Sequence, residues 1–77
     1  MSDATILRSL ARLERGTWVA ELRRRTGPVL FGRSWFYKAI DRLEYAGLVE
    51  DDYVLRNGRR HRWIRITSKG RKAARRG

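Results

Sequence analysis

The stretch GRSWFYKAIDRLEYAGLVE, residues 32–50, carries the strongest helix signal in the chain. Its apolar side chains recur at i, i+4 and i+7, at Phe36, Ile40 and Leu43, with Ala39 beside them. This spacing places one narrow apolar stripe on a helix whose remaining surface is polar or aromatic. We therefore expect a helix that packs on the rest of the domain through this stripe.

The end of this helix is marked by Gly47 and Leu48. Glycine is favoured just after a helix because that residue adopts a left-handed conformation, and the next residue then contacts the last turn. Leu48 would meet Leu43 in this arrangement. The pattern predicts that the helix ends at about Ala46.

The start of the helix has two candidate capping residues, Gly32 and Ser34. Gly32 is favoured, because Phe31 and Phe36 then have the spacing of a hydrophobic staple. Arg33 would lie in the first turn, where the helix dipole disfavours a cation. A phosphate at the helix N-terminus would remove this conflict, so Arg33 is a candidate phosphate ligand.

Charge is distributed unevenly along the chain. The 77 residues include 19 Lys and Arg against 8 Asp and Glu, a formal net charge of +11. Residues 1–55 contain nine basic and eight acidic residues, whereas residues 56–77 contain ten basic and no acidic residues. Solubility alone does not require such segregation, and arginine donates bidentately to phosphate. The composition favours a nucleic-acid partner over a purely solubilising role.

Two shorter helices are expected before the 32–50 stretch. The first runs from its N-cap Asp3 to Gly16, with an apolar stripe made of Ile6, Leu7, Leu10 and Leu13. Core packing explains this stripe, and a homodimer contact through Leu7 stays open. Thr17 and Trp18 form a brief extended piece, and a second helix from Val19 to Thr26 ends at Gly27 and Pro28.

The pair Asn57-Gly58 lies between two β-prone runs and predicts a hairpin with a type I′ turn. The resulting register pairs Arg56 with Arg59, Leu55 with Arg60, Tyr53 with Arg62 and Asp51 with Ile64. The face that carries Tyr53, Leu55, Ile64 and Ile66 is expected to meet the helices. The opposite face carries Val54, His61, Trp63 and Arg65.

Basic side chains gather at the tip of this hairpin. Arg56, Arg59 and Arg60 lie there with Arg62 lower down, and no acidic residue is expected within their reach; Asp51 and Asp52 are assigned to a turn. Opposed like charges destabilise a strand pair unless a counter-ion is supplied. The hairpin is therefore predicted to bind an anion.

The end of the chain is predicted to form a short helix, SKGRKAARRG, residues 68–77, capped by Thr67. Its apolar residues are only Gly and Ala, so it cannot supply a coiled-coil seam. Residues 70–77 form either a basic arm that follows phosphates or a frayed, solubilising tail.

This order of elements predicts an α+β fold, namely one winged helix-turn-helix domain over residues 1–77. It consists of a three-helix core, a basic β-hairpin wing at residues 53–66 and a short C-terminal helix. In such domains the third helix, here residues 32–46, lies in the major groove, and the wing reaches an adjacent groove or the backbone.

Three segments carry a family resemblance: AELRRRTG, FYKAIDRLEYAGLVE and WIRITSKG. They resemble the PadR and MarR-like winged-helix transcriptional regulators, with an early aromatic in the recognition helix, Gly-Leu-Val at its end and a basic wing before a Thr-x-x-Gly motif. The resemblance covers roughly residues 5–72. It implies recognition-helix positions for Ser34, Trp35, Tyr37, Lys38 and Arg42, and wing positions for Arg59, Arg60 and Arg62.

The sequence departs from both families. PadR-like proteins usually carry a C-terminal dimerisation helix, and MarR-like proteins usually surround a ligand pocket with additional helices. Residues 1–77 contain neither, so we expect no small-molecule effector, and homodimerisation stays open.

Helical projection places Ser34, Lys38, Asp41 and Tyr45 opposite the apolar stripe, with Trp35, Tyr37 and Arg42 beside them. Lys38 and Arg42 could donate to guanine, Ser34 to a phosphate or base, and Asp41 could accept from cytosine or orient Arg42. The alternative for Asp41 is a salt bridge with Arg42 or Lys38. For Trp35 and Tyr37, half-buried packing is the slightly favoured alternative.

These features predict a sequence-specific double-stranded DNA-binding transcriptional regulator. Alternatives are an architectural, nucleoid-associated protein, a phage or mobile-element adaptor that binds proteins, and an RNA-binding protein.

An enzyme is not expected, because there is no cysteine and the single His61 has no predicted carboxylate neighbour. For the same reason we expect no metal site and no cofactor. Neither a membrane span nor a signal-peptide pattern is present in the sequence, so we expect a cytoplasmic location.

Overall fold

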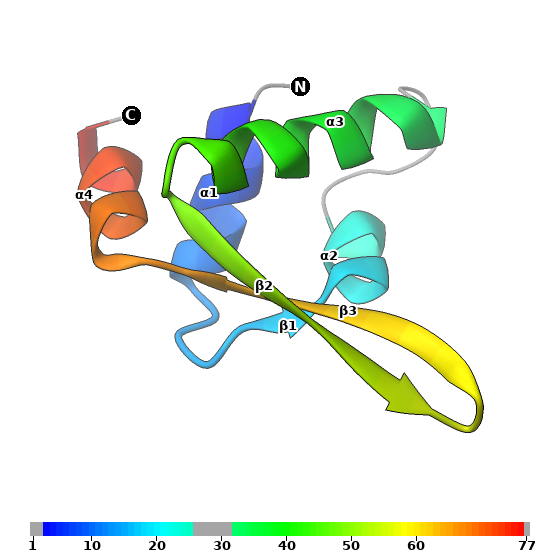
Figure 1. Cartoon of the computed structure of the whole chain (residues 1–77). Helices are drawn as coiled ribbons and strands as arrows, with labels where there is room; N and C mark the ends of the chain where they lie inside the picture. The colour runs from blue at the N-terminus through cyan, green and yellow to red at the C-terminus, as the bar shows by residue number, and fades with distance from the viewer. Residues whose placement is uncertain (1–2, 26–31, 77) are drawn as a thin grey trace.

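The computed structural model describes residues 3–25 and 32–76, with the backbone alone for Gly32, Arg33 and Ser34. Its elements are α1 (Asp3–Ala11), β1 (Thr17–Trp18), α2 (Val19–Arg25), α3 (Gly32–Tyr45), β2 (Val49–Arg56), β3 (Arg59–Ile66) and α4 (Ser68–Arg76) (Figure 1). The predicted end of the second helix at Thr26–Pro28 and the staple through Phe31 lie outside the described residues.

The apolar stripe of α3 is buried as predicted. Phe36, Ala39, Ile40 and Leu43 are at most 4% exposed and belong to one hydrophobic core. The other members of this core come from both shorter helices and from the sheet: Ile6, Leu7, Leu10, Val19, Leu22, Val49, Ile64 and Ile66. Burial of this stripe against the other elements is what holds α3 on the domain.

The first helix is shorter than predicted. It ends at Ala11, and turn hydrogen bonds then lead to Gly16, whose φ is 91°. A Cβ at Gly16 would lie 2.5 Å from the carbonyl oxygen of Ile64. Gly16 therefore lets the chain pass close to β3 as it enters the sheet, and it does not end a helix. Leu13 is only half-buried.

The end of α3 has the predicted Schellman geometry. The N–H of Leu48 donates to the carbonyl of Leu43 at 2.9 Å, and the N–H of Gly47 donates to that of Glu44 at 2.9 Å. Gly47 adopts a φ of 77°, which favours glycine. The chain thus turns directly from α3 into β2.

The hairpin is formed in the predicted register. Arg56 pairs with Arg59 and Tyr53 with Arg62, and both turn residues have positive φ, 52° at Asn57 and 75° at Gly58. The short strand β1 pairs with β3 through Thr17 and Ile64, so the antiparallel sheet has the order β1-β3-β2. We call β2, β3 and their connecting turn the wing.

One expectation about the wing is wrong. Only its inner end faces the helices, where Ile64 and Ile66 are buried, whereas Tyr53 is 58% and Leu55 76% exposed. The strand pair extends past the helices, as Figure 1 shows, so side chains on the outer half of the same face meet no helix. Alternation along a strand defines a face but not how far the covering layer reaches.

The segment Thr67–Gly70 closes the fold around the end of α3. The Thr67 hydroxyl donates to the carbonyl of Gly47 at 2.7 Å and accepts the N–H of Gly70 at 3.0 Å, as an N-cap of α4 does. The Lys69 ammonium donates to the carbonyl of Ala46 at 2.9 Å. These contacts supply donors to the carbonyls of the two residues that directly follow α3.

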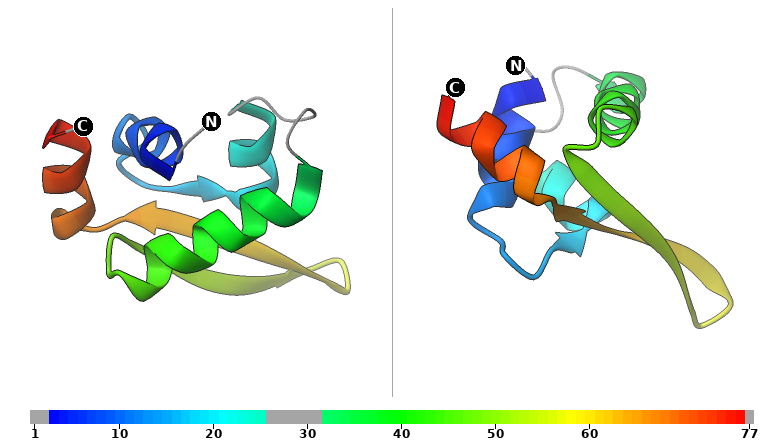
Figure 2. Two further views of the ribbon diagram at one scale, coloured as in Figure 1. Left: turned by 90° about the horizontal axis from the view of Figure 1, so that it is seen from above. Right: turned by 60° about the vertical axis from the view of Figure 1, so that its left-hand side comes forward.

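Helix α4 lies beside α1 (Figure 2). Ala73 and Ala74 pack against the core, and Gly70 is buried where α4 meets the end of α3. None of the helices in residues 3–25 and 32–76 is long and apolar enough to cross a membrane.

Gly70→Ala should destabilise the fold. The added Cβ would lie 2.0 Å from the carbonyl oxygen of Leu48 and 2.7 Å from Cγ1 of Ile66, so α4 must shift. We expect a loss of about 1–3 kcal/mol in the free energy of unfolding, measured by urea denaturation. Lys72→Ala, on the exposed surface of the same helix, is the control and should change it by less than about 0.5 kcal/mol. Equal stability of the two variants would contradict the tight contact.

Candidate nucleic-acid interface

The surface of α3 opposite its apolar stripe is exposed. Lys38, Asp41, Arg42 and Tyr45 all lie on it, and Tyr45 is 96% exposed. The predicted orientation of these residues is confirmed. The side chains of Arg33 and Ser34 lie outside the described residues, although both positions belong to the first turn of α3.

Arg42 is held by Asp3, at the start of α1. Its Nε donates to Asp3 Oδ2 at 3.0 Å and its Nη2 to Oδ1 at 2.8 Å, a bidentate pair. The hydrogen bond to Asp3 raises the pKa of Arg42. The expectation that Asp41 orients Arg42 is wrong, because the carboxylate that reaches it comes from another helix. This pair uses two of the five N–H groups of Arg42, and the side chain remains 53% exposed.

The two aromatic candidates on α3, Trp35 and Tyr37, are half-buried and pack against the core. Tyr37 also lies edge-on to Phe36, with 5.5 Å between the ring centroids. Their positions agree with the favoured packing interpretation. A contact with DNA would involve only the exposed edges of these rings.

The wing tip, residues 56–60, carries three exposed arginines. The guanidinium of Arg56 lies 5.6 Å from the ring centroid of Trp18, and that of Arg60 lies 5.1 Å from the ring of Tyr53. Within the described part of the chain, none of Arg56, Arg59 and Arg60 has a carboxylate partner, as predicted. Aromatic faces hold two of these cations in place without neutralising them.

Arg62 behaves differently from the tip arginines, and the prediction that no acid compensates it is wrong. It binds the carboxylate of Asp51, donates to Glu44 at 2.9 Å and contacts Asp41 at 3.3 Å. Its side chain is only 14% exposed and that of Asp51 only 12%. Arg62 therefore joins the wing to the last turns of α3 and is a structural residue.

The electrostatics of this cluster follow from its geometry. Burial lowers the pKa of Arg62, but the hydrogen bond and charge of Asp51, together with Tyr53 and Asp41, raise it overall. Burial and the neighbouring Asp51 raise the pKa of Glu44, and Arg62 opposes this shift. Three carboxylates thus share one guanidinium, which remains charged.

Asp51 lies in β2 rather than in the predicted turn. The predicted register already contained a signal for its contact with Arg62, because it places Asp51 and Arg62 on one face as diagonal neighbours across the strand pair. Diagonal partners with long side chains are within reach of one another. Asp41 and Glu44 reach Arg62 because of how α3 packs, and no feature of the sequence indicated these two contacts.

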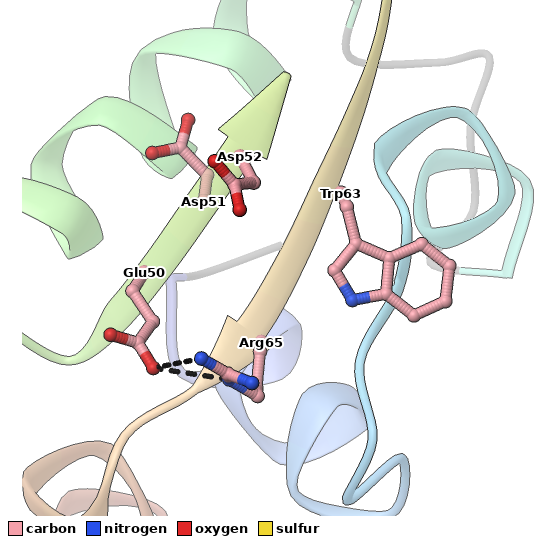
Figure 3. Close-up of a pocket in the computed structure, with 5 residues that line it drawn as sticks. All are labelled: Glu50, Asp51, Asp52, Trp63 and Arg65. Carbon is pink, nitrogen blue, oxygen red and sulfur yellow. Dashed lines mark hydrogen bonds and ion pairs between the residues drawn. The ribbon is translucent and has the colours of Figure 1, made fainter. Parts of the chain in front are cut away.

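A small hollow of about 150 Å³ lies on the sheet and is lined by Glu50, Asp51, Asp52, Trp63 and Arg65 (Figure 3). Arg65 donates to Glu50 Oε1 at 2.6 and 3.0 Å, so its charge is compensated. These acidic surroundings do not suit a phosphate. Among the described residues there is also no cluster of His, Cys, Asp and Glu that could hold a metal ion.

No family model and no curated protein matches the chain. The structure is similar to that of the transcriptional regulator PcaV from Streptomyces coelicolor, solved with its natural ligand, with a TM-score of 0.77 and 27% sequence identity. The fold is a winged helix-turn-helix. The predicted α+β fold class is thereby confirmed. The similarity covers 96% of this chain and 49% of PcaV, so the chain spans about half the length of that protein.

Arg62→Ala should lower stability, whereas Arg60→Ala should not. Removing Arg62 leaves Asp51, which is 12% exposed, facing Asp41 and Glu44 without a cation. We expect a loss of about 3 kcal/mol in the free energy of unfolding for Arg62→Ala and less than about 0.5 kcal/mol for Arg60→Ala. Urea denaturation measures both. Arg60 is a matched control because it lies on the same face of β3; equal effects would show that the cluster is not structural.

Proposed function

We propose that this chain is a double-stranded DNA-binding transcriptional regulator that recognises a specific sequence. The observation that supports the proposal most strongly is the arrangement of uncompensated cations on the fold. Lys38 on α3 and Arg56, Arg59 and Arg60 at the wing tip are exposed, and they lie on the two elements by which winged helices contact DNA. The similarity to the transcriptional regulator PcaV agrees with it.

In this proposal α3 enters the major groove. Lys38 is the main candidate for a base contact, because a lysine donates well to guanine O6 and N7. Arg42 is a second candidate, through the N–H groups that its pair with Asp3 leaves available. Arg33 and Ser34, in the first turn of α3, are proposed phosphate ligands at the positive end of the helix dipole.

The wing contributes affinity. Arg56, Arg59 and Arg60 are proposed to bind phosphates in the adjacent groove or along the backbone, where each contact displaces condensed counter-ions. Arg62 contributes indirectly, because its bonds to Asp51 and Glu44 set the position of the wing relative to α3. Trp35 and Tyr37 contribute mainly to the packing of the helix that carries Lys38.

Lys38→Ala and the double variant Arg59→Ala/Arg60→Ala should alter different properties. Sites selected from a randomised duplex pool should change with Lys38→Ala, at a cost of about 1–3 kcal/mol for the original site. The double variant should keep the site but bind all duplexes more weakly, with a salt slope shallower by roughly 0.9 for each phosphate that is no longer neutralised. Fluorescence anisotropy on selected and random duplexes at several salt concentrations measures both effects.

A second candidate function is architectural binding of DNA with little sequence preference. It is favoured by two ion pairs, because Arg42 of α3 is bound by Asp3 and Arg62 of β3 is bound by acidic residues. Fewer free guanidinium groups are then available on α3 and β3 to read bases. The same measurement separates the two candidates. If selected and random duplexes bind equally well, and Lys38→Ala matters no more than one wing arginine, the protein is architectural.

A further inference from the structure

Within residues 56–76, the ion pairs of the protein leave two separate regions of uncompensated positive charge. Six carboxylates form ion pairs in the described part of the chain, and their partners are Arg24, Arg25, Arg42, Arg62 and Arg65, on α2, α3 and β3. None of these pairs involves the wing tip or a basic residue of α4. Since α4 has five basic residues among nine, it forms a second cationic region.

This second region includes a groove between α1 and α4. The groove has a volume of about 370 Å³ and is lined by Arg8, Ala11, Arg12, Arg71, Ala74 and Arg75. Each side of the groove carries two arginines four residues apart, and two alanines lie between the sides. Arg12, Arg71 and Arg75 have no carboxylate partner among residues 3–25 and 32–76. We call this feature the α1–α4 groove.

The α1–α4 groove and the wing tip lie at opposite ends of the molecule. In Figure 1 the wing projects to one side of the sheet and α4 lies at the other, and the turned view in Figure 2 keeps α1 and α4 together and away from the wing. The longest dimension of the backbone is 39 Å. A straight duplex held by α3 and the wing therefore leaves the α1–α4 groove open.

We propose that the α1–α4 groove binds the phosphate backbone of a second DNA duplex, so that one copy of the protein bridges two duplexes. This inference rests on the proposed function for the first duplex. Arginine forks donate bidentately to phosphate, and Arg12, Arg71 and Arg75 supply a charged surface with small side chains beside them. Contacts of this kind carry no base readout, so the second duplex is bound without sequence preference.

The chemistry of the groove favours DNA over a protein. A protein partner usually anchors through buried apolar or aromatic side chains, and among the described residues Ala11 and Ala74 are the only apolar ones that line the groove. Protein–DNA interfaces are polar and strongly positive, as this groove is. A second copy of the chain is disfavoured, because a two-fold contact would place these arginines against one another.

A capture experiment tests the proposal. A biotinylated duplex on beads is saturated with the protein and washed, and a fluorescent duplex of random sequence is then added. Arg71→Ala/Arg75→Ala removes two charges from the groove. Lys72→Ala/Arg76→Ala removes two charges from the same helix at positions that do not line the groove, which makes it the matched control. Thermal melting of both variants verifies that α4 remains folded.

The expected result is specific to the groove. Arg71→Ala/Arg75→Ala should retain the protein on the beads within about twofold but lower capture of the fluorescent duplex at least about fivefold, with a shallower salt dependence. Lys72→Ala/Arg76→Ala should lower that capture much less. Equal capture by the two variants would overturn the proposal, including the case in which a dimer bridges duplexes through two wings.

Failure of the proposed function has a different signature. If the wild-type protein is not retained on the beads, or if Arg59→Ala/Arg60→Ala is retained as well as the wild type, the wing is not the first DNA contact. The groove is then tested separately, by binding of the wild type and of Arg71→Ala/Arg75→Ala to free duplex. Equal affinity of these two proteins would overturn the second site as well.

Discussion

The structure depends on how the carboxyl end of α3 is closed. Four backbone carbonyls at a helix end lack partners within the helix, and leaving them buried and unpaired is costly. Here Gly47 and Leu48 close the Schellman motif, while Thr67 and Lys69 donate to the carbonyls of Gly47 and Ala46. The absence of a side chain at Gly70 lets α4 approach Leu48. One junction thereby fixes α3, the start of β2 and the start of α4 together.

The second organising feature is the use of acidic residues as internal partners. Asp3 binds Arg42 of α3, and Asp51 with Glu44 binds Arg62 of the wing. These pairs attach α3 to α1 and to the wing. They fix the positions of these elements and also neutralise two arginines that could otherwise bind an anion. Among the remaining cations of residues 56–76, three lie at the wing tip and five lie along α4. The positive charge of this basic segment is therefore divided between two surfaces.

Much of the fold could be predicted because its signals are local. The period of Phe36, Ile40 and Leu43 depends on helix geometry alone, and Asn57-Gly58 imposes the register of the whole hairpin. The errors concern relations between elements. The exposure of Tyr53 and Leu55 depends on where the helical layer ends, and the compensation of Arg62 depends on the distance from β3 to α3. Neither the extent of the helical layer nor the distance from β3 to α3 follows from residues adjacent in the sequence.

Local signals in the amino-acid order were enough to predict most elements, the strand register, the fold class and the segregation of positive charge toward residues 56–77. Which of those charges remain available to solvent depends on tertiary packing, because an arginine is neutralised when packing brings a carboxylate within about 3 Å of it. Arg60 is exposed at the wing tip, whereas Arg62, two positions further along β3, is bound by Asp51. Helix α4 packs on α1 and not beside the wing (Figure 1). The basic residues 56–76 are therefore divided between two ends of the molecule.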